Sequence, residues 1–173
     1  GHLSIAMGEE TIASGYASVA MGFQTKANGD ESFATGRFNY ADGDASTAMG
    51  SDTKALGNIS TSMGSLTEAL GFASTAMGES SVANGNVSTA MGYETTAESF
   101  AETVIGGYNT NYTAASSSTW IGTDRLFVIG NGTSGSLSDA LIMLKNGNTG
   151  LGVSSPTATL HVSGTLRIMD GLQ

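Results

Sequence analysis

A glycine recurs at every seventh position through more than half of the chain, and this spacing constrains the fold more than any other feature. Between residues 8 and 106, 14 of the 15 positions in this phase are Gly, and Ser99 is the exception. Ala stands two residues before these positions in 13 of the 15 cases. Such regularity indicates a stack of identical structural units. The glycines are Gly8, Gly15, Gly22, Gly29, Gly36, Gly43, Gly50, Gly57, Gly64, Gly71, Gly78, Gly85, Gly92 and Gly106.

The true period is 14 residues, because alternate groups of seven differ. Half A reads Ser-x-Ala-Met-Gly, as in residues 18–22, and half B reads Thr-x-Ala-x-Gly, as in residues 25–29. A coiled coil is excluded, since each Gly would cost a helix about 1 kcal/mol relative to Ala and no Leu or Ile seam exists. Two short strands per repeat, each closed by a Gly with positive φ, fit the pattern better. The sequence therefore predicts an all-β fold, a parallel β-roll (β-solenoid) with 14-residue rungs over residues 1–106.

Side-chain alternation along a strand assigns the two faces of each rung. The positions four and two before each Gly share its face and hold Ser, Thr or Ala. In half B the intervening positions hold residues such as Lys26, Asn28 and Tyr40, which must face solvent. We therefore expect a narrow interior filled by small side chains.

The outward positions of half A form a continuous apolar ridge. A column of Met on the outside of a roll should be covered, and another copy of the chain is the simplest cover. We predict an obligate homo-oligomer with Met at its axis. The expected interface residues are Ile5, Met7, Val19, Met21, Phe33, Met49, Met63, Met77, Met91 and Ile105.

Beyond the repeats, residues 107–122 are expected to form a loop insertion and an irregular rung. Residues 123–173 are expected to form a C-terminal capping and β-hairpin region. Residues 120–122 and 127–130 are interpreted as wider rungs that cap the solenoid. The stretch 139–153 predicts a hairpin with Asn146-Gly147 as a type I′ turn. Alternation predicts a final strand through Leu160, Val162, Leu166 and Ile168, packed around the same axis.

Charge and composition exclude several classes of partner. The net charge is −9, and residues 1–106 hold 12 acidic and three basic side chains. This balance argues against nucleic acid and against anionic lipid. No run of 18 apolar residues is present, so we expect no direct membrane insertion by this fragment. The absence of Cys excludes disulfides and thiolate zinc sites.

No enzymatic chemistry is predicted. Apart from His2, the chain has one imidazole, His161, in an expected strand and without positioned partners. Ser and Thr are abundant, but none has an adjacent base. We therefore predict no catalytic residue, no cofactor and no metal. The open alternative is calcium at turns such as Asn28-Gly29-Asp30 and Asp42-Gly43-Asp44, although Asn and Asp also favour turns for conformational reasons.

The pattern Ser-x-Ala-Met-Gly-x-x-Thr-x-Ala-x-Gly-x-x resembles the head repeats of YadA-like trimeric autotransporter adhesins. The resemblance covers residues 4–106, about 60% of the chain. It implies a left-handed parallel β-roll and a homotrimer. It also implies extracellular presentation at a bacterial cell surface, with adhesion to a host-cell or extracellular-matrix protein or to a glycan receptor.

Residues 124–164 resemble a different class, a segment of phage tail fibres and of secreted bacterial proteins that often precedes a self-cleaving chaperone domain. The stretches that carry this likeness are residues 124–133, 140–152, Pro156 and 160–164. Two further functions therefore stay open. One is a phage or injection-system tail-fibre segment that contacts a receptor at a virion or fibre tip. The other is a purely structural spacer.

Overall fold

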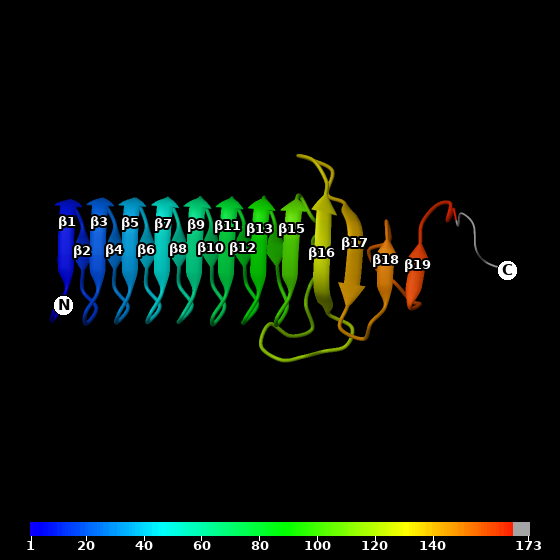
Figure 1. Cartoon of the computed structure of the whole chain (residues 1–173), viewed down its shortest axis with the longest axis horizontal. Coiled ribbons are helices and arrows are strands. Elements are labelled where there is room, and N and C mark those ends of the chain that lie inside the picture. Colours follow the sequence, from blue (N-terminus) through cyan, green and yellow to red (C-terminus); the bar gives the residue numbers. More distant parts are fainter. Residues whose placement is uncertain (168–173) are drawn as a thin grey trace.

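The computed structural model describes residues 1–167, which form a straight rod of stacked β-rungs with the N-terminus at one end (Figure 1). The described part contains 19 strands and no helix, so it holds no helix able to span a membrane. The predicted all-β solenoid with 14-residue rungs is confirmed.

Half A of every repeat forms a five-residue strand in one long-strand sheet. These strands are parallel and pair in register with a step of 14, as in Met49 with Met63. They are β1 (Ile5–Glu9), β3 (Val19–Phe23), β5 (Phe33–Arg37), β7 (Thr47–Ser51), β9 (Thr61–Ser65), β11 (Thr75–Glu79), β13 (Thr89–Tyr93) and β15 (Thr103–Gly107). The sheet then continues through β16 (Arg125–Asn131), β17 (Asp139–Leu144), β18 (Thr149–Leu151) and β19 (Leu160–Val162), reaching 12 strands.

Half B forms two-residue strands in a second, short-strand sheet of seven parallel members. They are β2 (Ile12–Ala13), β4 (Lys26–Ala27), β6 (Tyr40–Ala41), β8 (Lys54–Ala55), β10 (Glu68–Ala69), β12 (Val82–Ala83) and β14 (Thr96–Ala97). The short-strand sheet therefore ends at β14, while the long-strand sheet runs on for five more strands.

The core between the two sheets is as narrow as the sequence predicted. The alanines two residues before the repeat glycine positions, from Ala20 to Ala97, are fully buried, and the Ser and Thr residues two positions before these alanines are at most 1% exposed. Where the short-strand sheet gives out, the buried core position on the long strands becomes larger, namely Val104, Val128 and Ile142. These bulkier side chains fill volume that the second sheet no longer occupies.

The glycines serve close packing along the rod more than turn geometry. A Cβ on a repeat glycine from Gly8 to Gly106 would lie 1.9 to 2.2 Å from a backbone carbonyl oxygen of the next rung. Half A glycines have φ between +100° and +138° and lie within their strands. Half B glycines such as Gly57 do not have positive φ, so the expected use of positive φ is found only at the half A glycines.

The left-handed turn position lies two residues after each glycine position instead. Sixteen non-glycine residues from Leu3 to Tyr108 occupy it, at φ between 49° and 61°. They include the β-branched Ile59 and Val87, for which this conformation is costly. The turns are therefore imposed by the stacking of the rungs and not by local residue preference.

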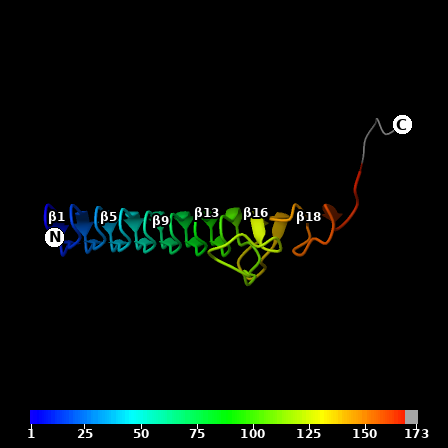
Figure 2. The ribbon, with the colours of Figure 1, turned by 90° about the horizontal axis from the view of Figure 1, so that it is seen from below.

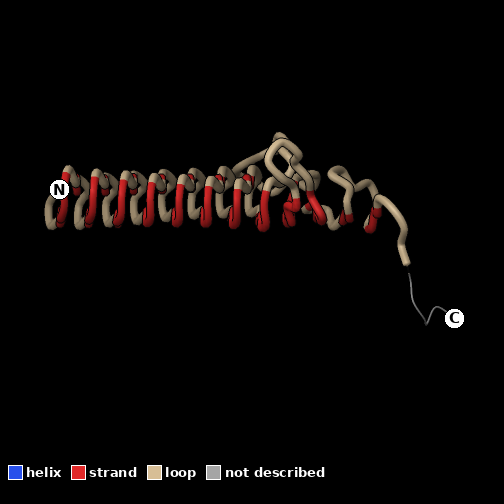
Figure 3. The backbone as a smooth tube through the Cα atoms, turned by 90° about the horizontal axis from the view of Figure 1, so that it is seen from above, coloured by secondary structure: helices blue, strands red, loops and turns tan. Residues whose placement is uncertain are grey.

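Residues 108–124 replace the missing half B strand of the last repeat. This segment leaves the rod on the side opposite the long strands and then returns to β16 (Figures 2 and 3). Trp120 is 54% exposed and lies outside any strand, so residues 120–122 do not form the expected rung. Residues 127–130 are also no irregular rung, because they pair with β15 in the regular parallel register.

The predicted C-terminal hairpin is present as β17 and β18, but its turn differs. The Gly147 N–H donates to the Leu144 carbonyl at 2.9 Å, and only Gly147 in the turn has positive φ. This is a type I turn followed by a left-handed glycine, which forms a three-residue loop. The final strand covers Leu160 to Val162, Leu166 lies outside it, and Ile168 lies outside the described residues.

Candidate interaction surface

The residues expected at the interface all lie on the outward face of the long-strand sheet. Because alternate side chains point to opposite faces, the first and third residues of each five-residue strand both project outward. The first column comprises Ile5, Val19, Phe33, Thr47, Thr61, Thr75, Thr89 and Thr103. The second comprises Met7, Met21, Thr35, Met49, Met63, Met77, Met91 and Ile105. We call these two columns, with their continuation below, the apolar face.

Within one chain, neighbours along the rod only partly cover this face. Most of its side chains are half-buried, while Met91 is 40% exposed. At the N-terminal end, Ile5 is 51% and Met7 60% exposed, because no rung lies beyond them in the structure. The face is thus a long apolar strip with one side open.

The columns do not stop where the repeat stops. Thr103 and Ile105 of β15 pair with Phe127 and Ile129 of β16, which project on the same side. The pairing then continues through Met143 and Leu141, Thr149 and Leu151, and Leu160 and Val162. The sequence placed only the last of these strands at the common axis and gave no prediction that β16 to β18 extend the columns. The signal for this continuation was the shared Val-Ile-Gly of residues 104–106 and 128–130.

The opposite, short-strand side is polar and open. Its central column carries Ile12, Lys26, Tyr40, Lys54, Glu68, Val82 and Thr96. Lys26 Nζ lies 5.1 Å from the centre of the Tyr40 ring, and Lys54 Nζ lies 2.6 Å from Glu68 Oε1. The hydrogen bond to Glu68 raises the pKa of Lys54. Exposed pairs of this kind contribute little to stability and leave the surface available for other contacts.

The turn residues considered for calcium bond to one another along the rod. Asn28 Nδ2 donates to Asp42 Oδ1 at 2.7 Å, and Asp30 Oδ1 accepts from the Tyr16 N–H at 2.7 Å. Asp44 Oδ1 accepts from the Asp30 N–H at 3.0 Å. In residues 1–167, no group of three or more His, Cys, Asp or Glu is arranged to hold a metal ion. These oxygens serve as side-chain ladders between rungs.

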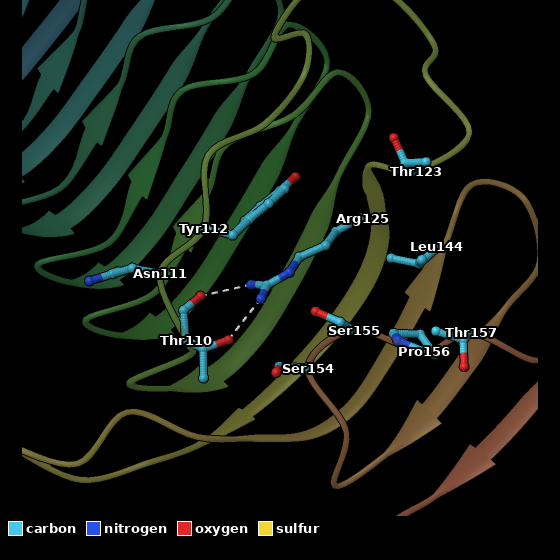
Figure 4. Close-up of a pocket in the computed structure, with 10 residues that line it drawn as sticks. All are labelled: Thr110, Asn111, Tyr112, Thr123, Arg125, Leu144, Ser154, Ser155, Pro156 and Thr157. Atoms are coloured by element: carbon cyan, nitrogen blue, oxygen red, sulfur yellow. Dashed lines mark hydrogen bonds between the residues drawn. The ribbon is translucent and has the colours of Figure 1, made fainter.

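A buried polar network joins the roll to the C-terminal region. The Arg125 guanidinium donates to the Thr110 carbonyl at 2.7 Å and to Thr110 Oγ1 at 2.8 Å (Figure 4). Asp139 accepts from the N–H and the hydroxyl of Thr110 and lies 3.7 Å from Arg125. Arg125 also stacks 4.2 Å from the ring centre of Tyr112. Arg125 is 4% exposed, so these contacts hold the returning loop against β16.

Deeper in the same junction, Glu102 is fully buried. Its Oε2 accepts from the N–H groups of Glu98 and Ser99 and from the hydroxyl of Tyr112, while Oε1 has no partner. Burial raises the pKa of Glu102 and of Tyr112. The loop that replaces the eighth short strand is therefore held in place partly by the Glu102 carboxyl group, one oxygen of which has no hydrogen-bond partner.

Lys145 reaches back from the hairpin to the one repeat position that is not Gly. Its Nζ donates to Ser99 Oγ at 2.7 Å, and burial lowers the pKa of Lys145. A Ser beside a Lys can act as a nucleophile and base. Ser99, however, is 0% exposed and no substrate could reach it. The pair therefore fastens the hairpin to the last short rung.

A cavity of about 410 Å³ lies next to this network (Figure 4). Most of its lining residues carry a hydroxyl or amide group, although the lining surface is largely apolar. Arg125 is its charged member, already engaged by Thr110 and Asp139. His161, in β19, lies outside the cavity lining, and its Nδ1 accepts a long bond from the Thr157 N–H at 3.5 Å. The cavity brings together no nucleophile and base.

The fold and its surfaces define a class: a thin parallel β-solenoid with one uncharged apolar face and one polar face. The family model described as the YadA head domain repeat matches residues 1–23, 13–39, 41–67 and 69–97. Together these segments cover more than half of the chain, which therefore belongs to the YadA head repeat family. No curated protein matched the sequence. Solenoids of this family are typical of non-enzymatic adhesin or fibre proteins and imply an extracellular, surface-exposed location.

Proposed function

We propose that the protein is the head of a trimeric surface adhesin, in which three rods pack with their apolar faces around a common axis. The observation that carries this proposal is the apolar face itself, which runs along every long strand of the roll. Family membership supports it, since YadA-type heads are trimeric and bind host ligands. The interface consists of the two columns already named, from Ile5 and Met7 to Thr103 and Ile105.

In this arrangement the short-strand side and both turn edges face outward and carry the acidic residues. Each chain contributes a charge of −9, so a trimer would repel anionic ligands such as heparin-like glycans. The ligand we propose is a host-cell or matrix protein or a neutral glycan at the outer side. We assign residues 1–106 to the binding rod, residues 107–122 to the loop that fastens its end, and residues 123–167 to the C-terminal cap.

Light scattering coupled to size exclusion tests the assembly directly. We expect a mass three times the chain mass of 17.4 kDa. A stable, folded monomer would contradict the proposal. Binding to arrays of matrix proteins and glycans then tests adhesion, and a confirmed trimer that binds none of them would favour a spacer.

The second candidate is a phage or injection-system tail-fibre segment. The likeness of residues 124–164 to such fibres favours it, and the same trimeric rod would serve that function. Genomic neighbours distinguish the two: structural genes of a phage favour the fibre, and a secretion anchor favours the adhesin.

A further inference from the structure

We propose that β16 to β19, which lie outside the repeats, form a second self-association element that continues the trimer axis with a different strand arrangement. This inference rests on the proposed function and extends it to a part of the chain that no repeat predicts. Its partner is another copy of the same four strands.

The first argument is continuity of the sheet. Paired residues on neighbouring strands project to the same face whether the strands are parallel or antiparallel. β17 runs antiparallel to β16, yet Met143 pairs with Phe127 and Leu141 with Ile129. The outward columns therefore survive the change of direction, and Figure 1 shows one unbroken sheet along the rod.

The second argument is the chemistry of the continuation. Its eight outward residues are Phe127, Ile129, Leu141, Met143, Thr149, Leu151, Leu160 and Val162. Seven of these are apolar, whereas the first column of the roll is mostly Thr. Met143 and Leu151 are each 36% exposed and Leu160 is 52% exposed in a single chain. Apolar side chains aligned on one face call for a covering surface.

The third argument identifies that surface as a second copy. Two residues from each of the 12 strands make up the apolar face, and none of them is charged, although the chain holds 21 charged side chains. Around a rotation axis every side chain meets copies of itself, so a charge there would face a like charge in a dry interface. A different protein as the partner would not require an uncharged face, because it could place an opposite charge against each charge of this chain. Exclusion of charge from both of these columns, along the full length of the sheet, is the pattern that self-association requires.

The inner side of β16 to β19 differs from that of an incomplete roll, because it has buried side chains of its own. Ile142 is fully buried, and Pro156 and Gly150 are buried beside it. The buried network around Arg125 and Lys145 fixes this region to the roll. This network thus fixes β16 and β17 to the roll, and β18 and β19 continue the same sheet by strand pairing, with one face open.

Single-cysteine variants test the inference, because the native chain has no Cys. The full-length chain would carry Met77→Cys in the roll, Leu151→Cys in β18, or Val82→Cys on the opposite sheet as the matched control. Each variant is treated with a short bis-maleimide at low protein concentration and separated under denaturing conditions. We expect covalent dimers from Met77→Cys and Leu151→Cys and monomer from Val82→Cys.

If Met77→Cys forms covalent dimers and Leu151→Cys does not, this inference is overturned, while the trimeric roll stays supported. Absence of links at both positions, together with a monomeric mass, would overturn the proposed function as well. Met143→Cys, one strand away, serves as a second reporter if Leu151→Cys alters the melting temperature.

Discussion

At the scale of single residues, this fold depends on positions that have no side chain. The half B glycines permit a spacing between rungs that any Cβ atom would prevent. Ser99 is the exception among these positions, and its place in the stack explains why. Ser99 can carry a side chain because β14 is the last short strand and no half B strand stacks upon it. Its hydroxyl is then used by Arg125, whose carbonyl accepts at 2.8 Å, and by Lys145.

Gly57→Ala should destabilise the rod strongly. The new Cβ would lie 2.0 Å from the Gly71 carbonyl oxygen, and backbone on both sides cannot shift without disturbing the stack. We expect a loss on the order of 3 kcal/mol in urea unfolding at fixed protein concentration. Gly122→Ala is the matched control, because its Cβ would lie 3.6 Å from Asn146 and should change stability by less than about 0.5 kcal/mol. Equal effects at the two sites would refute the stacking argument.

Val87→Asn should stabilise the protein. Val87 has φ of 60°, where a β-branched side chain is strained and Asn is well tolerated. We expect a gain of about 1 kcal/mol, seen as a higher melting temperature. Val82→Asn, at a strand position without positive φ, should have the opposite sign. A lower melting temperature for Val87→Asn would mean that an apolar contact of Val87 outweighs its backbone strain.

At the scale of elements, the point of interest is the end of the short-strand sheet. The side chain of Asn109 accepts from the Thr96 N–H at 2.8 Å and donates to the Thr96 carbonyl at 3.1 Å. It thereby imitates the next strand and closes the edge of β14, which would otherwise present free backbone groups. The loop that carries Asn109 also brings Tyr112 onto Glu102, so edge closure and the buried carboxyl group belong to one element.

The stability of this junction should depend on pH through Glu102. Burial raises its folded-state pKa above the unfolded value of about 4.3. The contribution of Glu102 to stability is therefore greatest below about pH 4 and falls as the pH rises through the raised pKa. Glu102→Gln does not titrate, so its stability relative to the native chain should improve between pH 4 and pH 7.

Tyr112→Phe provides the companion test, since it removes a hydrogen bond that favours the Glu102 carboxylate. We expect this variant to lose more stability than the native chain over the same pH range. Denaturant titrations at each pH measure both variants. If the native chain and Glu102→Gln differ by the same amount at pH 4 and pH 7, then Glu102 does not control the junction.

At the scale of the whole molecule, the apolar face and the acidic outer surfaces divide the rod into a side for self-association and sides for ligands. Met77→Lys should dissociate the trimer, because three ammonium groups would meet at the axis. We expect the mass from light scattering to fall from three chains to one. Val82→Lys makes an equivalent change on the opposite sheet and should leave the mass unchanged. A trimer that tolerates Met77→Lys would show that the axis lies elsewhere.

The sequence by itself determined the roll, its 14-residue rungs, the small-residue core and the position of the Met ridge. It could do so because each of these features recurs in every rung, where the same steric requirement selects the same residue types. The hairpin at Asn146-Gly147 was also predictable from the sequence, since it depends on local turn chemistry. Its turn type was not, because the N–H groups of Lys145 and Asn146 donate to the carbonyls of Asp124 and Gly122, and these contacts with a distant segment are not encoded in local residue preference.

Only the tertiary structure decided what occurs once in the chain. The pairing of β15 with β16 across a 17-residue excursion, the network of Glu102, Arg125 and Lys145, and the edge closure by Asn109 each join residues far apart in sequence. The left-handed turn positions recur every seven residues, but their residues, which include Glu10 and Val87, share no preference for that conformation. Contacts that form once leave no period in the sequence, and a conformation imposed by neighbouring rungs leaves no common residue type, so only the structure shows them.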